Sequence, residues 1–418
     1  MDYSLYLQAL LGIAVFVVIA LPMSSDRRAI NWKIIFVAIA LQFVICALLL
    51  KAPVVKESLL VLNRAVGALG EATMKGTSFV FGYLGGGTTP FTITNPGAVT
   101  TFAFQVLPLV IVMSALSALL WYWRILPVVI RGISLVFERA LGTRGPSGLV
   151  ATANVFLGQT EAPLLVKPYL DRMSRYELLL VMTAGMATIA GSVMVIYSAM
   201  LGAQFNGVLG HLITKSIMSV PGSILFAHIM LPDSADSQQA LQEPPRIYQS
   251  AMDSITRGTG DGLSIYLNII AILIVLTAFV ALANSAVGLL PSPDGVPVTL
   301  ERIAGWVFSP IAWLMGIPWS EATTAGSLLG IKSVLNEFIA YIQLSQMPVT
   351  ELSERSRLIT IYGLCGFANL ASIGIQISGI GAMAPDRRKD LADLAWPAFV
   401  AATLASCMTG CIVGIVAG

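Results

Sequence analysis

Charged side chains are scarce in this sequence of 418 residues. Asp, Glu, Lys and Arg make up 11% of it, whereas a soluble domain carries about 25%. Hydrophobic residues make up 56%, and the mean hydropathy is +0.82. The shortage of charge excludes an ordinary soluble protein and predicts an integral membrane protein. The formal net charge of +2 gives no reason to expect a nucleic acid as partner.

Residues that hold metals or perform covalent chemistry are also few. The two histidines lie outside the polar segments described below, and the four cysteines lie in apolar stretches without a Cys-x-x-Cys pair. These absences argue against a disulfide framework and a zinc site. The sequence has no His-Glu-x-x-His and no Gly-x-Ser-x-Gly motif. We therefore expect that the protein is not an enzyme.

Long apolar runs dominate the remaining sequence. Eight of them are long enough to cross a bilayer as helices, and they lie near 5–22, 34–50, 101–123, 177–200, 211–231, 264–290, 358–383 and 395–417. No Lys or Arg precedes the first run, which favours an uncleaved first helix over a signal peptide. Eight crossings place both termini on one side of the membrane.

The distribution of Lys and Arg predicts which side that is, because cytoplasmic loops carry an excess of them. The side of the first loop holds fifteen, namely Arg27, Arg28, Lys33, Arg124, Arg131, Arg139, Arg144, Lys167, Arg172, Arg175, Arg246, Arg257, Arg387, Arg388 and Lys389. The other side holds eight, namely Lys51, Lys56, Arg64, Lys75, Lys215, Arg302, Arg355 and Arg357. Both termini are therefore expected outside the cytoplasm.

Two further apolar segments are interrupted by polar residues, and each contains a carboxylate. Glu161 lies within 145–170, and Glu337 lies within 318–345, 176 residues later. A charged residue at membrane depth costs about 2.5–3.5 kcal/mol on insertion scales and marks a functional site. The assignment of Lys and Arg to the two sides of the membrane holds only if both segments enter the membrane and return to the same side. We predict two re-entrant helical hairpins, one from each side of the membrane.

A second pair of segments indicates an internal repeat. Residues 185–191 (GMATIAG) and 366–372 (GFANLAS) share Gly, Ala and Ala at one spacing, and each lies in the span that follows its hairpin. Small and polar residues there predict helices that are broken in the middle of the membrane. Paired broken helices in the two halves of a chain indicate the binding site of a transporter.

These features divide the chain into six parts. We expect N-terminal scaffold helices at 1–144, and the first hairpin and broken helix with the following span at 145–231. A cytoplasmic connector at 232–262 would lead to a scaffold span with an external segment at 263–317. The second hairpin and broken helix would occupy 318–383, and a C-terminal span 384–418. Within the first part, 57–100 is expected to form an external loop with one surface helix.

The polar runs resemble the signatures of the concentrative nucleoside transporter family. They are GQTEAP at 158–163, NEF at 336–338 and GFANL at 366–370, and the likeness extends over essentially the whole chain. The resemblance implies an all-α polytopic membrane protein with eight transmembrane helices, two re-entrant hairpins and an inverted-repeat transport core. It also implies a homotrimer in the lipid of a bacterial inner membrane. Each protomer would import nucleosides such as uridine by alternating access, as a cation symporter, with Na+ as the expected coupling ion.

The resemblance also assigns individual residues to roles. The nucleobase would be bound by Gln159, Thr160, Glu161, Val193 and Phe367, and the ribose hydroxyls by Glu337, Asn369 and Ser372. Sodium would be bound by the side chains of Asn154 and Thr188 and the main-chain oxygens of Leu157 and Ile189. The residue types suit a neutral ligand, since carboxylates accept from hydroxyls and ring N–H groups. Two carboxylates without an Arg disfavour a nucleotide.

Other interpretations stay open at this point. The symporter can be proton-coupled, and a channel or an intramembrane enzyme with an acid–base pair of carboxylates would also use hairpins. The two carboxylates can pair with Lys167 and Lys332, and Asn154 can cap a helix. Thr188 can bond to its own helix, and Phe367 can be a packing residue. A preference for purines or pyrimidines is not indicated.

Overall fold

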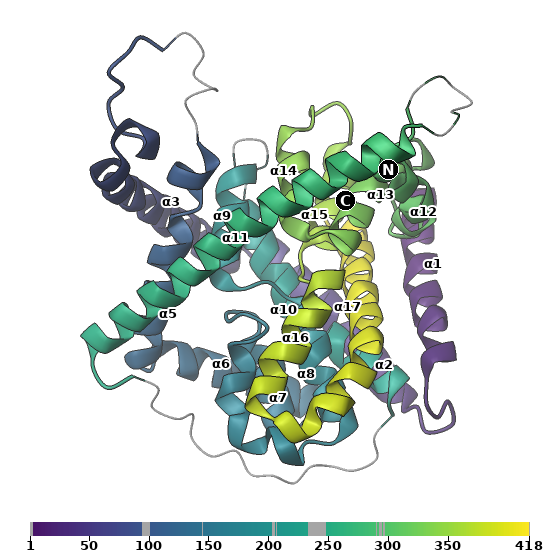
Figure 1. Ribbon diagram of the computed structural model, residues 1–418. Helices are drawn as coiled ribbons and strands as arrows, with labels where there is room; N and C mark the ends of the chain where they lie inside the picture. The colour runs from purple at the N-terminus through teal and green to yellow at the C-terminus, as the bar shows by residue number, and fades with distance from the viewer. Residues whose placement is uncertain are drawn as a thin grey trace.

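The computed structural model describes residues 3–93, 101–143, 145–202, 205, 207–232, 248–289, 291, 295 and 297–417, and these residues form helices and loops without strands (Figure 1). The predicted all-α class is therefore confirmed. Seven helical segments of the described chain are long and apolar enough to cross a membrane. They are Ser4–Met23, Trp32–Lys51, Phe102–Tyr122, Arg175–Leu201, Val208–Met230, Ala251–Val287 and Pro385–Val416. The eighth predicted span, 358–383, is divided into two shorter helices.

The N-terminal part consists of long helices joined by short turns. They are α1 (Tyr3–Ala20), the 3-10 turn η1 (Leu21–Met23), α2 (Trp32–Lys51), α3 (Pro53–Phe81), η2 (Gly82–Gly85), the π-helical turn η3 (Phe102–Val106), α5 (Leu109–Tyr122) and α6 (Ile125–Leu141). Asn31 starts α2, because its side chain accepts from Lys33 N at 3.1 Å. Helix α3 begins before the predicted external loop 57–100 and extends to Phe81, and residues 94–100 of that segment lie outside the described chain.

The middle of the chain departs from the expected connector. Residues 233–247 lie outside the described chain, as does Arg144, and α11 (Ala251–Val287) begins within the predicted connector 232–262. Helix α11 runs diagonally across the front of the molecule in Figure 1 and packs along α5. The predicted external segment contains a second helix, α12 (Leu300–Leu314), which packs along α13.

The first hairpin and broken helix occupy 146–201. The hairpin has the arms α7 (Pro146–Ala153) and η4 (Ala162–Arg172), which pack against each other. Helix α8 (Arg175–Ala187) starts with a capping box, in which Ser174 and Glu177 each accept from the other's main-chain N–H. It ends at the extended residues 188–190, and α9 (Gly191–Leu201) follows.

The second hairpin and broken helix occupy 319–383. The arms are α13 (Trp319–Val334) and α14 (Glu337–Gln346), and the two half-helices are α15 (Glu354–Leu364) and α16 (Leu370–Met383). Asparagine caps start two of these helices: Asn336 accepts from Ile339 N at 2.9 Å, and Asn369 accepts from Ser372 N at 2.8 Å. The cap positions place both polar residues at a helix terminus beside the interior of the molecule.

The two helix breaks contact each other directly. Phe367 N donates to Thr188 O at 3.2 Å, so a main-chain hydrogen bond joins the second break to the first. Gly366 has φ +152°, and a Cβ there would lie 2.9 Å from Ala187 O. A side chain at this position would therefore push the two breaks apart. Helices α10 (Val208–Met230) and α17 (Arg388–Val416), with the turn η5 (Pro385–Arg387), pack around this centre.

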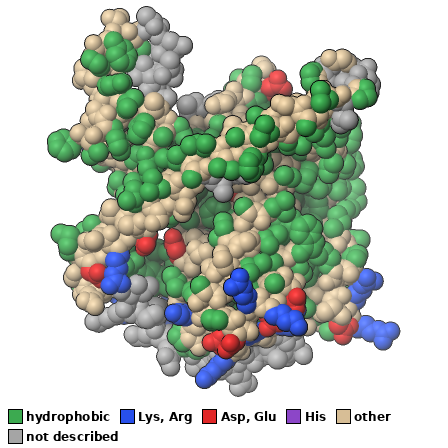
Figure 2. Space-filling view, viewed as in Figure 1, with side chains coloured by type: hydrophobic (Ala, Val, Ile, Leu, Met, Phe, Trp, Pro, Cys, Tyr) green, Lys and Arg blue, Asp and Glu red, His purple; other side chains and the backbone are tan. Residues whose placement is uncertain are grey.

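The two hairpins lie at opposite ends of the molecule. In Figure 1, α7 is at the lower end, whereas α13, α14 and both termini are in the upper half. Lys and Arg side chains gather in the lower half of the same view (Figure 2). One residue of the charge count is misplaced, because Lys215 is fully buried in α10 and belongs to neither face.

Candidate functional site

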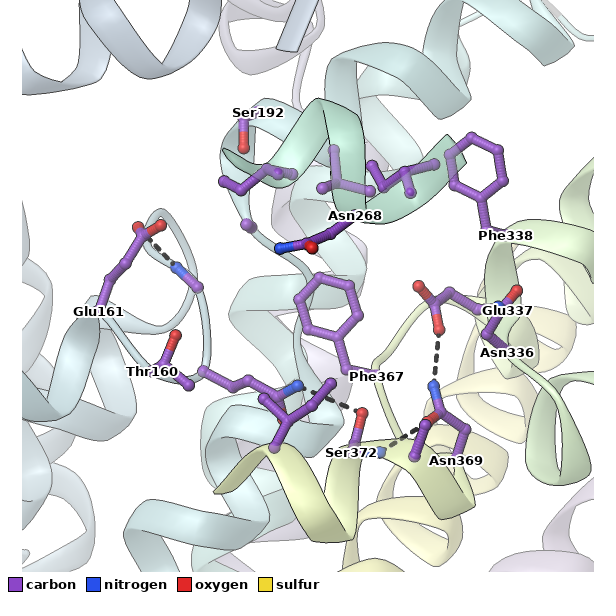
Figure 3. Close-up of a pocket in the computed structure, with 18 of the residues that line it drawn as sticks. Thr160, Glu161, Ser192, Asn268, Asn336, Glu337, Phe338, Phe367, Asn369 and Ser372 are labelled. Carbon is purple, nitrogen blue, oxygen red and sulfur yellow. Dashed lines mark hydrogen bonds between the residues drawn. The ribbon is translucent and has the colours of Figure 1, made fainter. Parts of the chain in front are cut away.

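A cavity of about 390 Å³ lies where the hairpin tips meet the broken helices. All eight residues predicted to contact a nucleoside line it, namely Gln159, Thr160, Glu161, Val193, Glu337, Phe367, Asn369 and Ser372. They come from the tip of the first hairpin (between α7 and η4), from α9, from the tip of the second hairpin (between α13 and α14) and from the second break (between α15 and α16) with the start of α16 (Figure 3). Cavities of this size commonly hold small organic ligands. Segments far apart in the sequence thus contribute to one site.

Glu337 is held in place by two hydrogen bonds. Its Oε1 accepts from the Tyr197 hydroxyl at 2.9 Å, and its Oε2 accepts from Asn369 Nδ2 at 3.0 Å. The side chain is only 5% exposed. Each carboxylate oxygen has two lone pairs, so one on each oxygen remains available for a ligand hydroxyl. The buried carboxylate is therefore oriented and still able to accept from a ligand.

A second set of hydrogen bonds ties the first tip to α16. Gln159 Nε2 donates to Ser372 Oγ at 3.2 Å, and Gln159 Oε1 accepts from Gln376 Nε2 at 3.2 Å. Gln376 also donates to Met182 O at 3.0 Å. These bonds fix the orientation of the Gln159 amide. The first hairpin tip is therefore attached to the second broken helix through side chains.

The opposite wall of the cavity carries the second carboxylate. Glu161 is exposed, and its Oε2 accepts from Gly158 N at 3.1 Å. Figure 3 shows Glu161 and Glu337 on opposite sides of the cavity, with the ring of Phe367 between them. A planar ligand stacked on that ring would present one edge to each carboxylate. The arrangement suits a ligand with hydrogen-bond donors at both ends.

The four residues predicted to bind sodium do not line this cavity. Asn154 follows α7, is 0% exposed, and has neither side-chain polar atom in a hydrogen bond. Thr188, at the first break, donates its hydroxyl proton to Ala184 O at 2.8 Å, so its oxygen keeps lone pairs. Ile189 is fully buried and Leu157 partly buried. A buried amide without a partner costs about 1–3 kcal/mol, and a cation bound at its oxygen would remove part of that cost.

The structure also decides between simpler roles for these residues. Glu337 forms no salt bridge with Lys332 and Glu161 forms none with Lys167, within the residues the structure describes. Asn154 is the C-cap residue of α7 through its main-chain N–H, and its side-chain polar atoms take no part in that cap. The alternative for Thr188 is present, since its hydroxyl bonds to its own helix.

Sequence reasoning missed several polar residues in or beside the site, including Ser192 in the cavity wall. Tyr197 looks like a packing aromatic within an apolar run, and Gln376 lies one turn beyond the recognised motif. Asn268 lies on α11, which was assigned to the scaffold, yet it lines the cavity and points toward Phe367 in Figure 3. An isolated Asn in a long apolar helix was the available signal for this last residue.

A second cavity of about 520 Å³ adjoins the first. The two share Glu161 and Ser192 in their walls. The second cavity lies between α5, the N-terminal part of α11 and the first hairpin, and its lining includes Tyr248, Arg257 and Asp261. A ligand leaving the first cavity past Glu161 would enter this space.

Comparisons with known proteins agree with this geometry. Models described as "Na+ dependent nucleoside transporter" match residues 11–84 and 211–414, and one described as "Nucleoside recognition" matches 103–204. The chain is 36% identical to an uncharacterized transporter of Haemophilus influenzae (99% of this chain, 98% of that protein). It is 35% identical to the nucleoside permease NupC of Helicobacter pylori (98% and 97%). A solved structure of CNTnw in an inward-facing substrate-bound state superposes with a TM-score of 0.90 at 36% identity (99% and 98%).

Proposed function

This chain is a multi-pass membrane protein of the concentrative nucleoside transporter family, and we propose that it is a sodium-coupled symporter that imports nucleosides across the bacterial inner membrane. The observation that carries the proposal is the convergence of the eight predicted side chains, six of them from three separate motifs, on one cavity of about 390 Å³. The relatives named above are described as transporters and permeases, which supports a protein that moves its ligand unchanged.

The chemistry of the cavity favours a nucleoside over other small molecules. Glu337 and Asn369 offer acceptors and donors for ribose hydroxyls at the second tip. Gln159, Thr160 and Glu161 offer the same for the edge of a base, and Phe367 offers a face for stacking. The two carboxylates would repel a phosphate, which disfavours nucleotides.

Sodium is the proposed coupling ion because a hard cation takes oxygen ligands at a helix break. The unbonded amide of Asn154 would supply one oxygen and the Thr188 hydroxyl another, with the main-chain oxygens of Leu157 and Ile189. The description of the matching family models as Na+ dependent supports the choice. A proton-coupled symporter is the alternative.

Alternating access is the proposed mechanism. Hairpins at opposite ends and paired broken helices support a moving unit of 145–200 and 318–383 that carries the ligand past a fixed scaffold. In this proposal the hairpins are re-entrant, eight helices cross the membrane, and three protomers associate through the scaffold. Both termini would face the periplasm, since they lie away from the end where Lys and Arg gather.

Uptake into proteoliposomes tests the function and the ion together. Radiolabelled uridine is offered to vesicles with an imposed sodium gradient, a proton gradient, or neither. We expect accumulation above the external concentration with sodium alone, and its collapse when the gradient is dissipated. Accumulation with a proton gradient alone would replace sodium by protons. Equilibration without accumulation would indicate a channel, and a changed product would indicate an enzyme.

Crosslinking tests the moving unit. Ser117 on α5 and Leu164 on the first hairpin both line the second cavity, so a cysteine at each would face the partner element. In a background without the four native cysteines, bridging the pair with a bifunctional reagent should arrest uptake and leave nucleoside binding measurable. The single-cysteine variants are the controls. Full uptake with a verified crosslink would contradict this division of the chain.

A further inference from the structure

Two lysines are buried in the helical core, where an ammonium group is costly unless it is paired. Lys215 is 0% exposed and Lys332 is 1% exposed. Lys332 Nζ donates to Gly363 O at 3.0 Å, and Lys215 Nζ donates to Ala187 O and Ser406 Oγ. Neither lysine forms a salt bridge with a residue that the structure describes. Main-chain carbonyl groups are thus the chief partners of both ammonium groups.

These carbonyl groups are available because the helices are broken. In a continuous helix Gly363 O would accept from Phe367 N, which instead donates to Thr188 O at 3.2 Å. The oxygen of Ala187 loses its helical partner in the same way, at the end of α8. The carboxyl end of a helix carries a partial negative charge. The lysines therefore occupy positions at which broken helices of transporters bind ions.

The two lysines differ in the charges around them. Lys332 belongs to α13, the first arm of the second hairpin, and it interacts electrostatically with the Glu337 carboxylate. Lys215 belongs to α10, outside both hairpins, and its charged neighbour is Lys332. Only Lys332 therefore brings a positive charge from within a hairpin to the carboxylate of the nucleoside cavity.

The first hairpin lacks such a group. Its first arm and tip, 146–161, contain no Lys or Arg, and Asn154 stands there with an unbonded amide. The second repeat, 318–383, is described throughout, and two of its buried side-chain atoms have no hydrogen bond, namely Gln376 Oε1 and Arg355 Nε. Thus the first hairpin carries an unbonded buried amide, whereas the second carries a lysine bonded to the end of a broken helix.

We propose that Lys332 is a tethered cation that takes the place of a second coupling ion, so that each protomer binds one free cation. The inference rests on the proposed function, in which a cation binds beside Asn154. Lys332 fixes the coupling ratio because its ammonium group is covalently attached and cannot be exchanged with the solution. Replacing it with a shorter oxygen-bearing side chain would open a second site for a free cation.

The number of bound cations can be measured without any transport. The melting temperature of the purified native protein is recorded against sodium concentration, since an ion that binds only the folded state stabilises it by mass action. We expect a dependence corresponding to about one ion for the native protein. Lys332→Asn should show a steeper dependence, corresponding to about two ions. Lys332→Met, which fills the space and offers no oxygen, should show about one.

Lys215→Asn is the matched control, because it removes an equally buried ammonium group that donates to Ala187 O at the end of α8. It should lower the melting temperature and keep the native ion count. A native count of zero or two overturns the proposal, as does a Lys332→Asn variant with the native count. If neither Lys332 variant folds, the number of sodium ions bound by the native protein is the deciding measurement. Failure of uridine uptake under both gradients would contradict the proposed function and leave the ion count as an independent result.

Discussion

The two hairpin tips carry similar side chains but differ in how completely those side chains are bonded. At the second tip, Glu337 is 5% exposed and bonded on both oxygens, and Asn336 caps α14. At the first tip, Glu161 is exposed and Asn154 is buried without a hydrogen bond. The carboxylate at the second tip is thus oriented by hydrogen bonds from two side chains, whereas the first hairpin contains a buried amide without a hydrogen bond.

This difference indicates a division of labour between the repeats. A group that is already bonded and oriented binds a ligand with little reorganisation, which favours selectivity. A buried polar group without a partner gains from binding, which favours a switch that responds to an ion. We infer that the second tip contributes most to nucleoside affinity, and that the first hairpin contacts the base and also responds to the cation. Three substitutions test this comparison, and they are given in order of decreasing effect.

Glu337→Ala should have the largest effect. It removes the acceptor of Tyr197 and Asn369 together with the proposed ribose contacts, and hydrogen bonds to a charged group are worth about 1.5–3 kcal/mol. We expect nucleoside binding to weaken about 100-fold, measured by titration calorimetry. Glu337→Gln, which keeps an acceptor oxygen, should lose less. Unchanged uridine affinity in a folded Glu337→Ala sample would remove Glu337 from the recognition site.

Asn154→Leu should separate ion dependence from stability. The substitution removes one proposed oxygen ligand, so the sodium concentration for half-maximal uptake should rise about tenfold, as for the loss of about 1.4 kcal/mol. Because it also removes an unbonded buried amide, the melting temperature without sodium should stay the same or rise. A lower melting temperature with unchanged sodium dependence would mean that Asn154 is structural.

Glu161→Gln should have the smallest effect. The new amide oxygen can still accept from Gly158 N, and the side chain is exposed, so only the charge is lost. We expect nucleoside affinity to fall about fivefold, corresponding to about 1 kcal/mol for a hydrogen bond. The same titration as for Glu337→Ala measures it. A loss as large as that of Glu337→Ala would remove the proposed difference between the tips.

Much of the site could be predicted from the sequence because polar residues are rare in it. Glu161, Glu337 and Asn369 stand out in apolar surroundings, and all three line one cavity. Tyr197 could not be recognised in the same way, since an aromatic side chain in an apolar run is compatible with packing alone. Its role depends on a contact with Glu337, 140 positions away in the chain.

The start of α11 was mispredicted for a reason visible in its packing. The predicted connector 232–262 included Gly258 and Gly262. In the structure they lie one helical turn apart, and a Cβ would meet Ala118 Cβ and Ile111 Cα at 2.7 Å in each case. The glycines therefore allow α11 to approach α5 closely, as small residues do between membrane helices. Composition alone does not distinguish this use of glycine from a loop.

The main-chain bond between the breaks has a consequence for how this protein can evolve. Side chains in the cavity wall can be exchanged one by one, which would let substrate preference drift. The bond from Phe367 N to Thr188 O involves only backbone atoms, so most point mutations leave it intact. Gly366 is the exception, because any side chain there meets Ala187 O. Amino-acid substitutions should therefore be tolerated more readily in the cavity wall than at Gly366.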